Sequence, residues 1–285
     1  MKILLIGRNG QVATAFQNLA AAEGVELIVL GRAEADLLQP EEAAKAVGDH
    51  IAGVDAVVNT AAWTAVDKAE TEIEAARAVN ATTPGAVARV AAAAGVPFVH
   101  ISTDYVFDGS GDAPWKPTDP TGPLGAYGQT KLEGEEAIRA AGGSHAILRT
   151  SWVFSETGAN FVKTMLRLSE TRDKLTVVGD QVGGPTAADA IASACLALAR
   201  GLVAGKPSET LHFSGFPDVS WADFAREIFA RAGRQVSVKD IPTSAYPTPA
   251  RRPENSRMDC SALAGWGIER PDWRKGLNDV LAKLS

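Results

Sequence analysis

The chain has 285 residues, of which 46% are hydrophobic and 22% charged, a length that suits one large or two modest domains with a substantial core. Acidic residues outnumber basic ones by 34 to 28, and the formal net charge is −6. This balance argues against a broad basic surface for nucleic acid or an anionic membrane, but it is compatible with a small anionic ligand in a local pocket.

No apolar run is long enough for a membrane-spanning helix, and the longest candidate, residues 90–101, is interrupted by Pro97. The first residues lack the cleavage pattern of a signal peptide. We therefore expect a cytoplasmic protein with neither nucleic acid nor membrane as a partner. The two cysteines, Cys195 and Cys260, and the scattered histidines lack metal-site spacing, so we expect no catalytic metal.

In the first half of the chain, short apolar runs alternate with Ala-rich helical stretches. Residues 2–6 form a run that ends at a glycine, residues 11–22 follow as a helix, and residues 25–30 close a first strand–helix–strand unit. Thr83 and Pro84 are typical of a helix start. Further strand-like runs are residues 54–59, 97–102 and 145–149. Strands that alternate with helices in this way predict an α/β fold, a Rossmann-type doubly wound parallel sheet.

Beyond residue 151 the pattern changes to shorter helices interrupted by Gly- and Pro-rich segments. This half predicts helices at residues 189–202, 221–232 and 272–284 and short strands at residues 175–178 and 210–213. We therefore divide the chain into a Rossmann-type domain, residues 1–150, and a smaller α/β lobe, residues 151–285, with some exchange of chain between them.

A glycine loop follows the first strand. Gly7, Gly10 and Ala13 give the pattern G-x-x-G-x-x-A, in which glycines allow a tight turn and a close approach of the backbone to a pyrophosphate at a helix N-terminus. The second strand ends in Leu30, Gly31 and Arg32, where an acidic residue would bind an adenosine ribose 2′-hydroxyl. An arginine there can pair with a 2′-phosphate, which favours NADPH over NADH; a solvated surface arginine is the alternative.

Tyr127 and Lys131 lie four residues apart on a predicted helix and therefore share one face. An ammonium near the phenol is expected to lower the pKa of Tyr127 towards the working pH and leave a proton to give. Ser102 and Thr103 stand at the end of the fourth strand, the edge where ligands bind in doubly wound sheets. A hydroxyl there can hydrogen-bond a reacting carbonyl beside Tyr127.

These motifs together resemble the extended short-chain dehydrogenase/reductase superfamily. Longer blocks resemble, more closely, the dTDP-4-dehydrorhamnose reductase family: VVNTAAWTAVDKAE at residues 57–70, STDYVFDG at 102–109, RTSWVF at 149–154 and YPTPARRPENSR at 246–257. The resemblance spans almost the whole chain. It implies reduction of the C4 ketone of dTDP-4-dehydro-6-deoxy-L-mannose (dTDP-4-dehydro-L-rhamnose) to dTDP-L-rhamnose, the final step of dTDP-rhamnose biosynthesis.

By matching position, the resemblance implies Tyr127 as the proton donor, Lys131 as the residue that holds the nicotinamide ribose and tunes the tyrosine, and Thr103 as the group that orients the carbonyl. It implies that Thr103, Asp104 and Trp152 contact the substrate, with Trp152 against the hexose. The expected cofactor contacts are Gly7, Gly10, Gln11, Val12, Arg32, Asp36, Leu37, Ala62, Trp63, Thr64, Tyr127 and Lys131. Arginines 251, 252 and 257, with Gln181 and Thr186, are further candidates by residue type.

Two alternatives stay open at this stage. One is a sugar-nucleotide epimerase or dehydratase of the same superfamily. The other is a non-catalytic regulatory subunit, similar to that of methionine adenosyltransferase. Some members of the family form dimers bridged by Mg²⁺ through acidic residues after the phosphate loop. This chain has Ala13, Thr14, Ala15 and Phe16 there, so we expect no such bridge and a monomer or weak homodimer.

Overall fold

The computed structural model, which describes residues 1–284, is built around a six-stranded sheet in which every neighbouring pair is parallel. The strand order is β10-β5-β4-β3-β1-β2. The strands are β1 (Lys2–Ile6), β2 (Glu26–Leu30), β3 (Ala56–Asn59), β4 (Phe98–Thr103), β5 (His145–Thr150) and β10 (Glu209–Phe213). The predicted doubly wound parallel sheet is confirmed. Because the chain leaves β1 in one direction to β2 and later in the other to β3, a crevice forms at the carboxyl end of β1.

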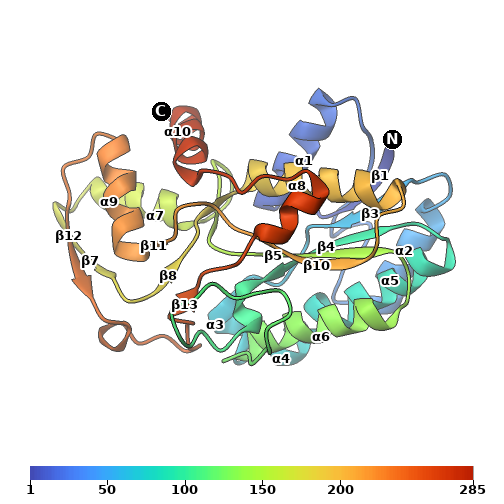
Figure 1. Cartoon of the computed structure of the whole chain (residues 1–285), viewed down its shortest axis with the longest axis horizontal. Coiled ribbons are helices and arrows are strands. Elements are labelled where there is room, and N and C mark those ends of the chain that lie inside the picture. Colours follow the sequence, from blue (N-terminus) through green and yellow to red (C-terminus); the bar gives the residue numbers. More distant parts are fainter. Residues whose placement is uncertain (285) are drawn as a thin grey trace.

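Helices cover both faces of this sheet (Figure 1). One face is covered by α1 (Gln11–Ala22) and α8 (Ala188–Val203), and the other by α2 (Pro40–His50), α5 (Thr83–Ala93) and α6 (Ala126–Ala140). Successive β1 side chains alternate between the two cores: Ile3 and Leu5 join the first, Leu4 and Ile6 the second. This two-sided burial explains why the strand reads as an unbroken apolar run.

Short helices connect β3 to α5. They are α3 (Val66–Ala69), α4 (Ile73–Arg77) and a π-helical turn, Ala78–Thr82, that leads directly into α5. The α-helix does begin at Thr83, as predicted, but it continues the preceding π-helical turn and is not a separate new helix. A 3₁₀ turn, Asp104–Val106, follows β4.

The second lobe packs α7 (Phe161–Ser169), α9 (Trp221–Arg231) and α10 (Trp273–Leu284) around its own apolar core and lies at the left of Figure 1. A parallel pair, β7 (Lys174–Val178) and β12 (Ser237–Ile241), completes this core. The remaining elements are short: β6 (Val153–Phe154), β8 (Val182–Gly183), β9 (Thr186–Ala187), β11 (Val219–Ser220), β13 (Asn255–Ser256) and 3₁₀ turns at Thr243–Ala245 and Ser261–Trp266.

Two elements that were expected in the second lobe belong to the first lobe. Residues 210–213 were expected in the second lobe, but they form β10, which pairs with β5 and completes the first sheet. The helix expected at residues 189–202 is α8, and it packs against α1. An apolar run indicates a buried strand but not the sheet that buries it, so periodicity alone could not assign these elements. Among residues 1–284, no helix is long and apolar enough to cross a membrane.

Candidate active site

The glycine loop lies between β1 and α1, at the crevice. Gly7 has φ +111°, and a Cβ atom there would lie 2.6 Å from Thr60 Oγ1, so only glycine fits this turn. Gly10 is the extended N-cap of α1, has no side-chain cap, and has open space where a Cβ would project. The first-turn N–H groups of α1 therefore have no capping side chain, which is the donor set that a diphosphate requires.

The next two residues of the loop turn inward. Val12 is buried in the core between α1 and α8. The Gln11 side chain reaches the second lobe, where its Oε1 accepts hydrogen bonds of 2.9 Å from both Ser155 Oγ and Asn160 Nδ2. Gln11 thus links the phosphate loop to the segment after β6.

The end of β2 carries charges of both signs. Arg32 is exposed and lies 3.6 Å from Asp36, whose Oδ1 also accepts from the Leu38 amide. Sequence reasoning missed Glu34, which pairs with Arg8 at 2.9 Å and accepts from the Gly31 amide at 2.9 Å. An acidic group therefore does stand at the end of β2, although it lies three residues later than Gly31 and is already bound to an arginine.

The segment after β3 is held by Asn80, a second residue that the sequence did not single out. Asn80 Oδ1 accepts from the Trp63 amide at 2.8 Å, and Asn80 Nδ2 donates to the Trp63 carbonyl and to Thr130 Oγ1 at 3.2 Å each. Thr130 Oγ1 in turn donates to the Tyr127 carbonyl. The buried Asn80 therefore connects the expected cofactor segment, Ala62, Trp63 and Thr64, to the first turn of α6. Leu37, also expected at the cofactor, accepts at its carbonyl from Thr83.

Tyr127 and Thr103 meet at the carboxyl end of β4. Tyr127 lies beside Thr103, whose hydroxyl donates to Asp104 Oδ1 at 3.0 Å. Burial raises the pKa of Tyr127 to about 12, the Thr103 hydrogen bond opposes this, and the charge of Asp104 adds to it. The expected lowering of the Tyr127 pKa by Lys131 is thus not found in this structure, because burial raises that pKa and the Lys131 amine is directed elsewhere.

Lys131 turns towards β4. Its Nζ donates to the Ile101 carbonyl at 2.6 Å and lies 3.0 Å from Nε2 of His100, and the side chain is buried. Burial lowers the pKa of Lys131 to about 8, although the negative charge of Glu135 favours the ammonium. His100 is fully buried, and burial followed by the charge of Lys131 holds its pKa well below the ordinary value.

Asp104 and Trp152, the expected substrate contacts, occupy the same edge. Asp104 is buried, its Oδ2 has no hydrogen-bond partner, and burial raises its pKa to about 6 against hydrogen bonds from Ser256 and Thr103. Trp152 has φ +48°, and its ring stacks on Trp221 of α9 with centroids 3.6 Å apart. One face of the Trp152 ring is therefore already covered by the second lobe.

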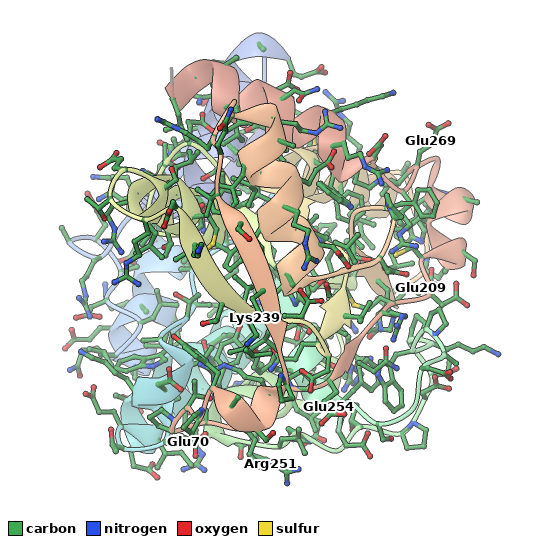
Figure 2. The ribbon with its side chains drawn as sticks, turned by 90° about the vertical axis from the view of Figure 1, so that its left-hand side faces the viewer. Glu70, Glu209, Lys239, Arg251, Glu254 and Glu269 are labelled. Carbon is green, nitrogen blue, oxygen red and sulfur yellow. The ribbon has the colours of Figure 1, made fainter. Side chains whose placement is uncertain are left out.

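A cleft of about 940 Å³ opens beside these residues, between the lobes. Tyr105, whose ring lies edge-on to that of Tyr127 with centroids 5.5 Å apart, and Arg252 line the cleft near the catalytic residues, and Trp221, Gln181 and Lys239 line its wall in the second lobe. Arg252 is paired with Asp67 of α3 at 2.9 Å, a contact that joins residues 250–252 to the first lobe. Figure 2 shows Lys239 on β12, near the centre of that view.

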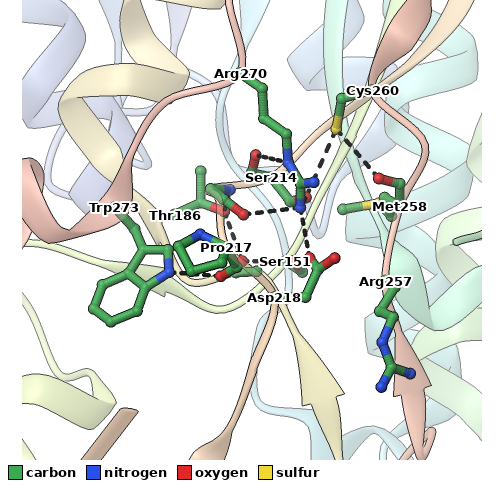
Figure 3. Close-up of polar contacts among 12 residues, drawn as sticks. Ser151, Thr186, Ser214, Pro217, Asp218, Arg257, Met258, Cys260, Arg270 and Trp273 are labelled. Carbon is green, nitrogen blue, oxygen red and sulfur yellow. Dashed lines mark hydrogen bonds and ion pairs between the residues drawn. The ribbon is translucent and has the colours of Figure 1, made fainter. Parts of the chain in front are cut away.

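The other arginine and threonine candidates lie elsewhere. Arg251 is exposed and points outward at the lower edge of the molecule in Figure 2. Arg257 bonds the Asn255 side chain at 3.0 Å. Thr186 is buried, and its hydroxyl accepts from the Gly215 amide within the cluster of Figure 3, where Arg270 bonds Asp218 and the Ser214 and Gly215 carbonyls. Of these candidates, Arg252 and Gln181 are the ones at the cleft. Within residues 1–284, no group of three or more His, Cys, Asp or Glu side chains is arranged to hold a metal ion.

Comparison with known proteins agrees with this geometry. The family model described as "RmlD substrate binding domain" matches residues 1–285. A dTDP-4-dehydrorhamnose reductase from Sinorhizobium fredii is 46% identical over 100% of this chain and 98% of its own length. The crystal structure of a dTDP-4-dehydrorhamnose reductase from Clostridium acetobutylicum superposes with a TM-score of 0.92 at 36% identity, and covers 100% of this chain and 99% of its own. That of the Bacillus anthracis enzyme, solved in complex with NADP, has a TM-score of 0.90 at 29% identity and 99% coverage of both chains.

Proposed function

The chain belongs to the dTDP-4-dehydrorhamnose reductase family, and we infer from this premise that it reduces the C4 ketone of dTDP-4-dehydro-6-deoxy-L-mannose to dTDP-L-rhamnose. It is an NAD(P)H-dependent oxidoreductase of dTDP-rhamnose and polysaccharide biosynthesis. The full-length match to reductases favours this function over the epimerase, dehydratase and regulatory-subunit alternatives.

The observation that carries the assignment of roles is that Tyr127 and Thr103 lie side by side at the carboxyl edge of the sheet, next to Asp104. A phenol whose pKa lies near 12 keeps its proton at neutral pH, as a donor to the C4 oxygen must. Tyr127 gives that proton as the ketone becomes an alcohol, while the Thr103 hydroxyl hydrogen-bonds the same oxygen and orients it. Lys131, one turn further along α6, holds the nicotinamide ribose. The nicotinamide, when bound, supplies the hydride.

The residues of the crevice fit a dinucleotide. The glycine turn at Gly7, the open backbone at Gly10 and the uncapped N-terminus of α1 suit the diphosphate. Gln11 and Val12 anchor the glycine loop to the rest of the protein. Asp36 and Leu37 flank the adenosine of the dinucleotide. The dinucleotide then passes Ala62, Trp63 and Thr64 on the way to Tyr127. Since the sheet crevice is where doubly wound folds bind dinucleotides, the fit rests on position as well as on donor type.

We assign NADPH as the preferred reductant and NADH as the weaker one. Arg8 and Arg32 both lie near the end of β2, where they can pair with a 2′-phosphate, and Glu34 there is already committed to Arg8 and the Gly31 amide. Comparison of kcat/KM for the two reductants, in the wild type and in Arg32→Ala, tests this. An NADPH preference that falls in the variant supports the role of Arg32. Equal kcat/KM for the two reductants in the wild type would contradict the preference for NADPH and with it this role of Arg32.

The sugar nucleotide occupies the cleft between the lobes. Asp104 and Thr103 face the hexose, and the free Oδ2 of Asp104 suits a sugar hydroxyl. Trp152 forms the hexose wall through the ring face that Trp221 leaves uncovered. Arg252 and Lys239 offer positive charge to the diphosphate, which explains how a chain of net charge −6 binds two anionic nucleotides.

The function is tested by mixing purified protein with NADPH and the dTDP-4-keto sugar and following NADPH oxidation together with the mass of the product. We expect stoichiometric oxidation and a product two mass units heavier. Tightly held NAD⁺ without net NADPH oxidation would instead indicate an epimerase or dehydratase. A stable complex with a synthetase and no turnover would indicate a regulatory subunit. We further propose a cytoplasmic monomer or weak homodimer without a bridging Mg²⁺, which sedimentation with and without a chelator will test.

A further inference from the structure

The amine of Lys131 lies in a buried polar pocket under the active site rather than at its surface. Its Nζ contacts the Ile101 carbonyl at 2.6 Å and His100 Nε2 at 3.0 Å, and 1% of the residue is exposed. A lysine that is to hold a ribose must present N–H groups to that ribose. The contacts that Lys131 makes in this structure therefore bear on its charge before the cofactor arrives.

The hydrogen bonds around His100 decide which ring nitrogen carries its proton. Asn59 Oδ1 accepts from the Ala61 amide at 3.0 Å, so the other end of this side chain, Nδ2, faces His100 Nδ1 at 3.1 Å. Because Nδ2 can only donate, Nδ1 of His100 must accept. A neutral imidazole that accepts at Nδ1 carries its hydrogen on Nε2, and this N–H faces Lys131 Nζ.

An ammonium has three donors and no acceptor, so a charged Lys131 would set two donors against each other inside the protein. If the His100 hydrogen were on Nδ1, it would face the Asn59 Nδ2 donor instead. If the Asn59 amide were also turned, its NH₂ group would face the Ala61 N–H donor. A neutral amine removes this conflict: Nζ donates to Ile101 and accepts from His100. A buried donor without an acceptor destabilises the protein, which favours the arrangement in which every group is paired.

We propose that His100 is a positioning residue that favours the neutral amine of Lys131 against β4 in the cofactor-free protein, so that Lys131 loses its proton at a lower pH than an ordinary lysine, and that in the alkaline range where this amine is neutral dinucleotide binding is coupled to uptake of one proton by Lys131. The proton comes from solvent and adds to the Nζ lone pair that accepted from His100 Nε2. His100 stays neutral and keeps its Nε2 hydrogen. The ammonium then directs its donors to the ribose hydroxyls. The coupling rests on the proposed function, because it assigns Lys131 to the nicotinamide ribose.

The charged groups around the pair are compatible with this arrangement. On α6, Glu135 favours the ammonium, but both of its oxygens are bound to Arg149 of β5, and Arg139 adds a further positive charge. On β4, His100 is the facing titratable group, and at the end of that strand Asp104 and Tyr127 interact with each other. Burial lowers the pKa of both Lys131 and His100, the direction that neutrality of both requires.

The first test needs no cofactor. Protein labelled with ¹³C and ¹⁵N in lysine and histidine is titrated by NMR. We expect His100 to show the Nε2–H tautomer, and Lys131 to titrate near pH 8 instead of near 10.5. In His100→Gln, whose carbonyl can accept from an ammonium, the Lys131 midpoint should rise by about one unit or more. His212→Gln changes another buried histidine that bonds Arg149 and should leave the midpoint unchanged. An Nδ1–H tautomer, or an ordinary Lys131 midpoint in the wild type, overturns the proposal.

The second test measures the coupling. Calorimetric titration of NADPH in buffers of different ionisation enthalpy, above about pH 8, should show uptake of close to one proton, and Kd should rise about tenfold per pH unit there. In His100→Gln both effects should shrink. Binding without proton uptake refutes the coupling. Failure of NADPH to bind contradicts the proposed function and the coupling with it, while the neutral amine is still decided by the cofactor-free titration.

Discussion

Replacing Glu135 by Gln removes one negative charge from the buried centre of the catalytic helix. The Glu135 carboxylate accepts from Ser102 Oγ at 2.6 Å, from Arg149 Nε at 2.9 Å, from Arg149 Nη2 at 2.7 Å and from Arg139 Nη1 at 3.3 Å. Glu135 is fully buried and Arg149 is 2% exposed. Gln keeps the shape but places an NH₂ donor against a guanidinium that has no other carboxylate partner.

The size of the effect follows from this burial. Breaking a buried pair by removing one partner costs about 3–5 kcal/mol, because the remaining charge stays desolvated. Glu133→Gln, two residues away on α6, is the matched control. Its carboxylate pairs with Arg77, but about a third of each side chain is exposed, and such pairs contribute about 0–1 kcal/mol.

Urea unfolding of the two variants measures the difference. With a slope of about 3 kcal/mol per M, Glu135→Gln should lower the midpoint by about 1 M or more, and Glu133→Gln by no more than about 0.3 M. The gap should depend on pH. Burial alone would raise the pKa of Glu135, but the hydrogen bonds and charge of Arg149 outweigh it and hold this pKa below 4.5. The contribution is therefore full above about pH 4.5 and is lost as the pH falls through the lowered value.

Equal urea midpoints for the two variants at neutral pH would refute this prediction, since they would mean that Arg149 without its carboxylate partner carries no desolvation cost. A pH-independent gap would contradict the assignment to ionisation. Replacing both Glu135 and Arg149 by Met should be less damaging than Glu135→Gln, because no uncompensated charge remains.

Three further predictions concern the active site directly. Tyr127→Phe should lower kcat by about 10²–10⁴-fold with little change in the Kd for NADPH, because only the proton donor is lost; turnover close to wild type would remove Tyr127 from the mechanism. Asp104→Asn should stabilise the protein by about 1–3 kcal/mol at pH 8 and much less at pH 4, because the folded pKa near 6 exceeds the unfolded 3.8 and stability falls as the pH rises between them. A gain of the same size at both pH values in thermal unfolding would argue against this account. Gly134→Ala would place a Cβ 2.0 Å from the Asn80 carbonyl and should destabilise the protein by about 1–3 kcal/mol and lower kcat, whereas Gly265→Ala has open space and should be neutral in both assays.

Local signals were sufficient for much of the fold. The strand at residues 2–6 was predicted with its observed bounds, and the other sheet strands of the first half within two residues, because strands buried on both faces are apolar at every position. The Tyr127 and Lys131 pair is likewise local, since a four-residue spacing on a helix places two side chains on one face.

The partners of the site residues were not predictable in this way. His100, Asn80 and Glu135 gave no motif, because each acts through residues between 14 and 50 positions away in the chain that only the folded sheet brings near. Trp152 offered an aromatic ring, but its stacking on Trp221 depends on how the second lobe meets the first. The same holds for β10, whose sequence indicates a buried strand without indicating the sheet.

The sequence by itself determined the class of fold, the phosphate loop and the identity of the chemical groups, because these depend on spacings of a few residues and on backbone freedom at Gly7 and Gly10. The tertiary structure alone decided the charge state of those groups. Burial raises the pKa of Tyr127, and the contacts with His100 and Ile101 direct Lys131 inward. Desolvation and pairing depend on every atom around a group, and most of those atoms come from distant parts of the chain.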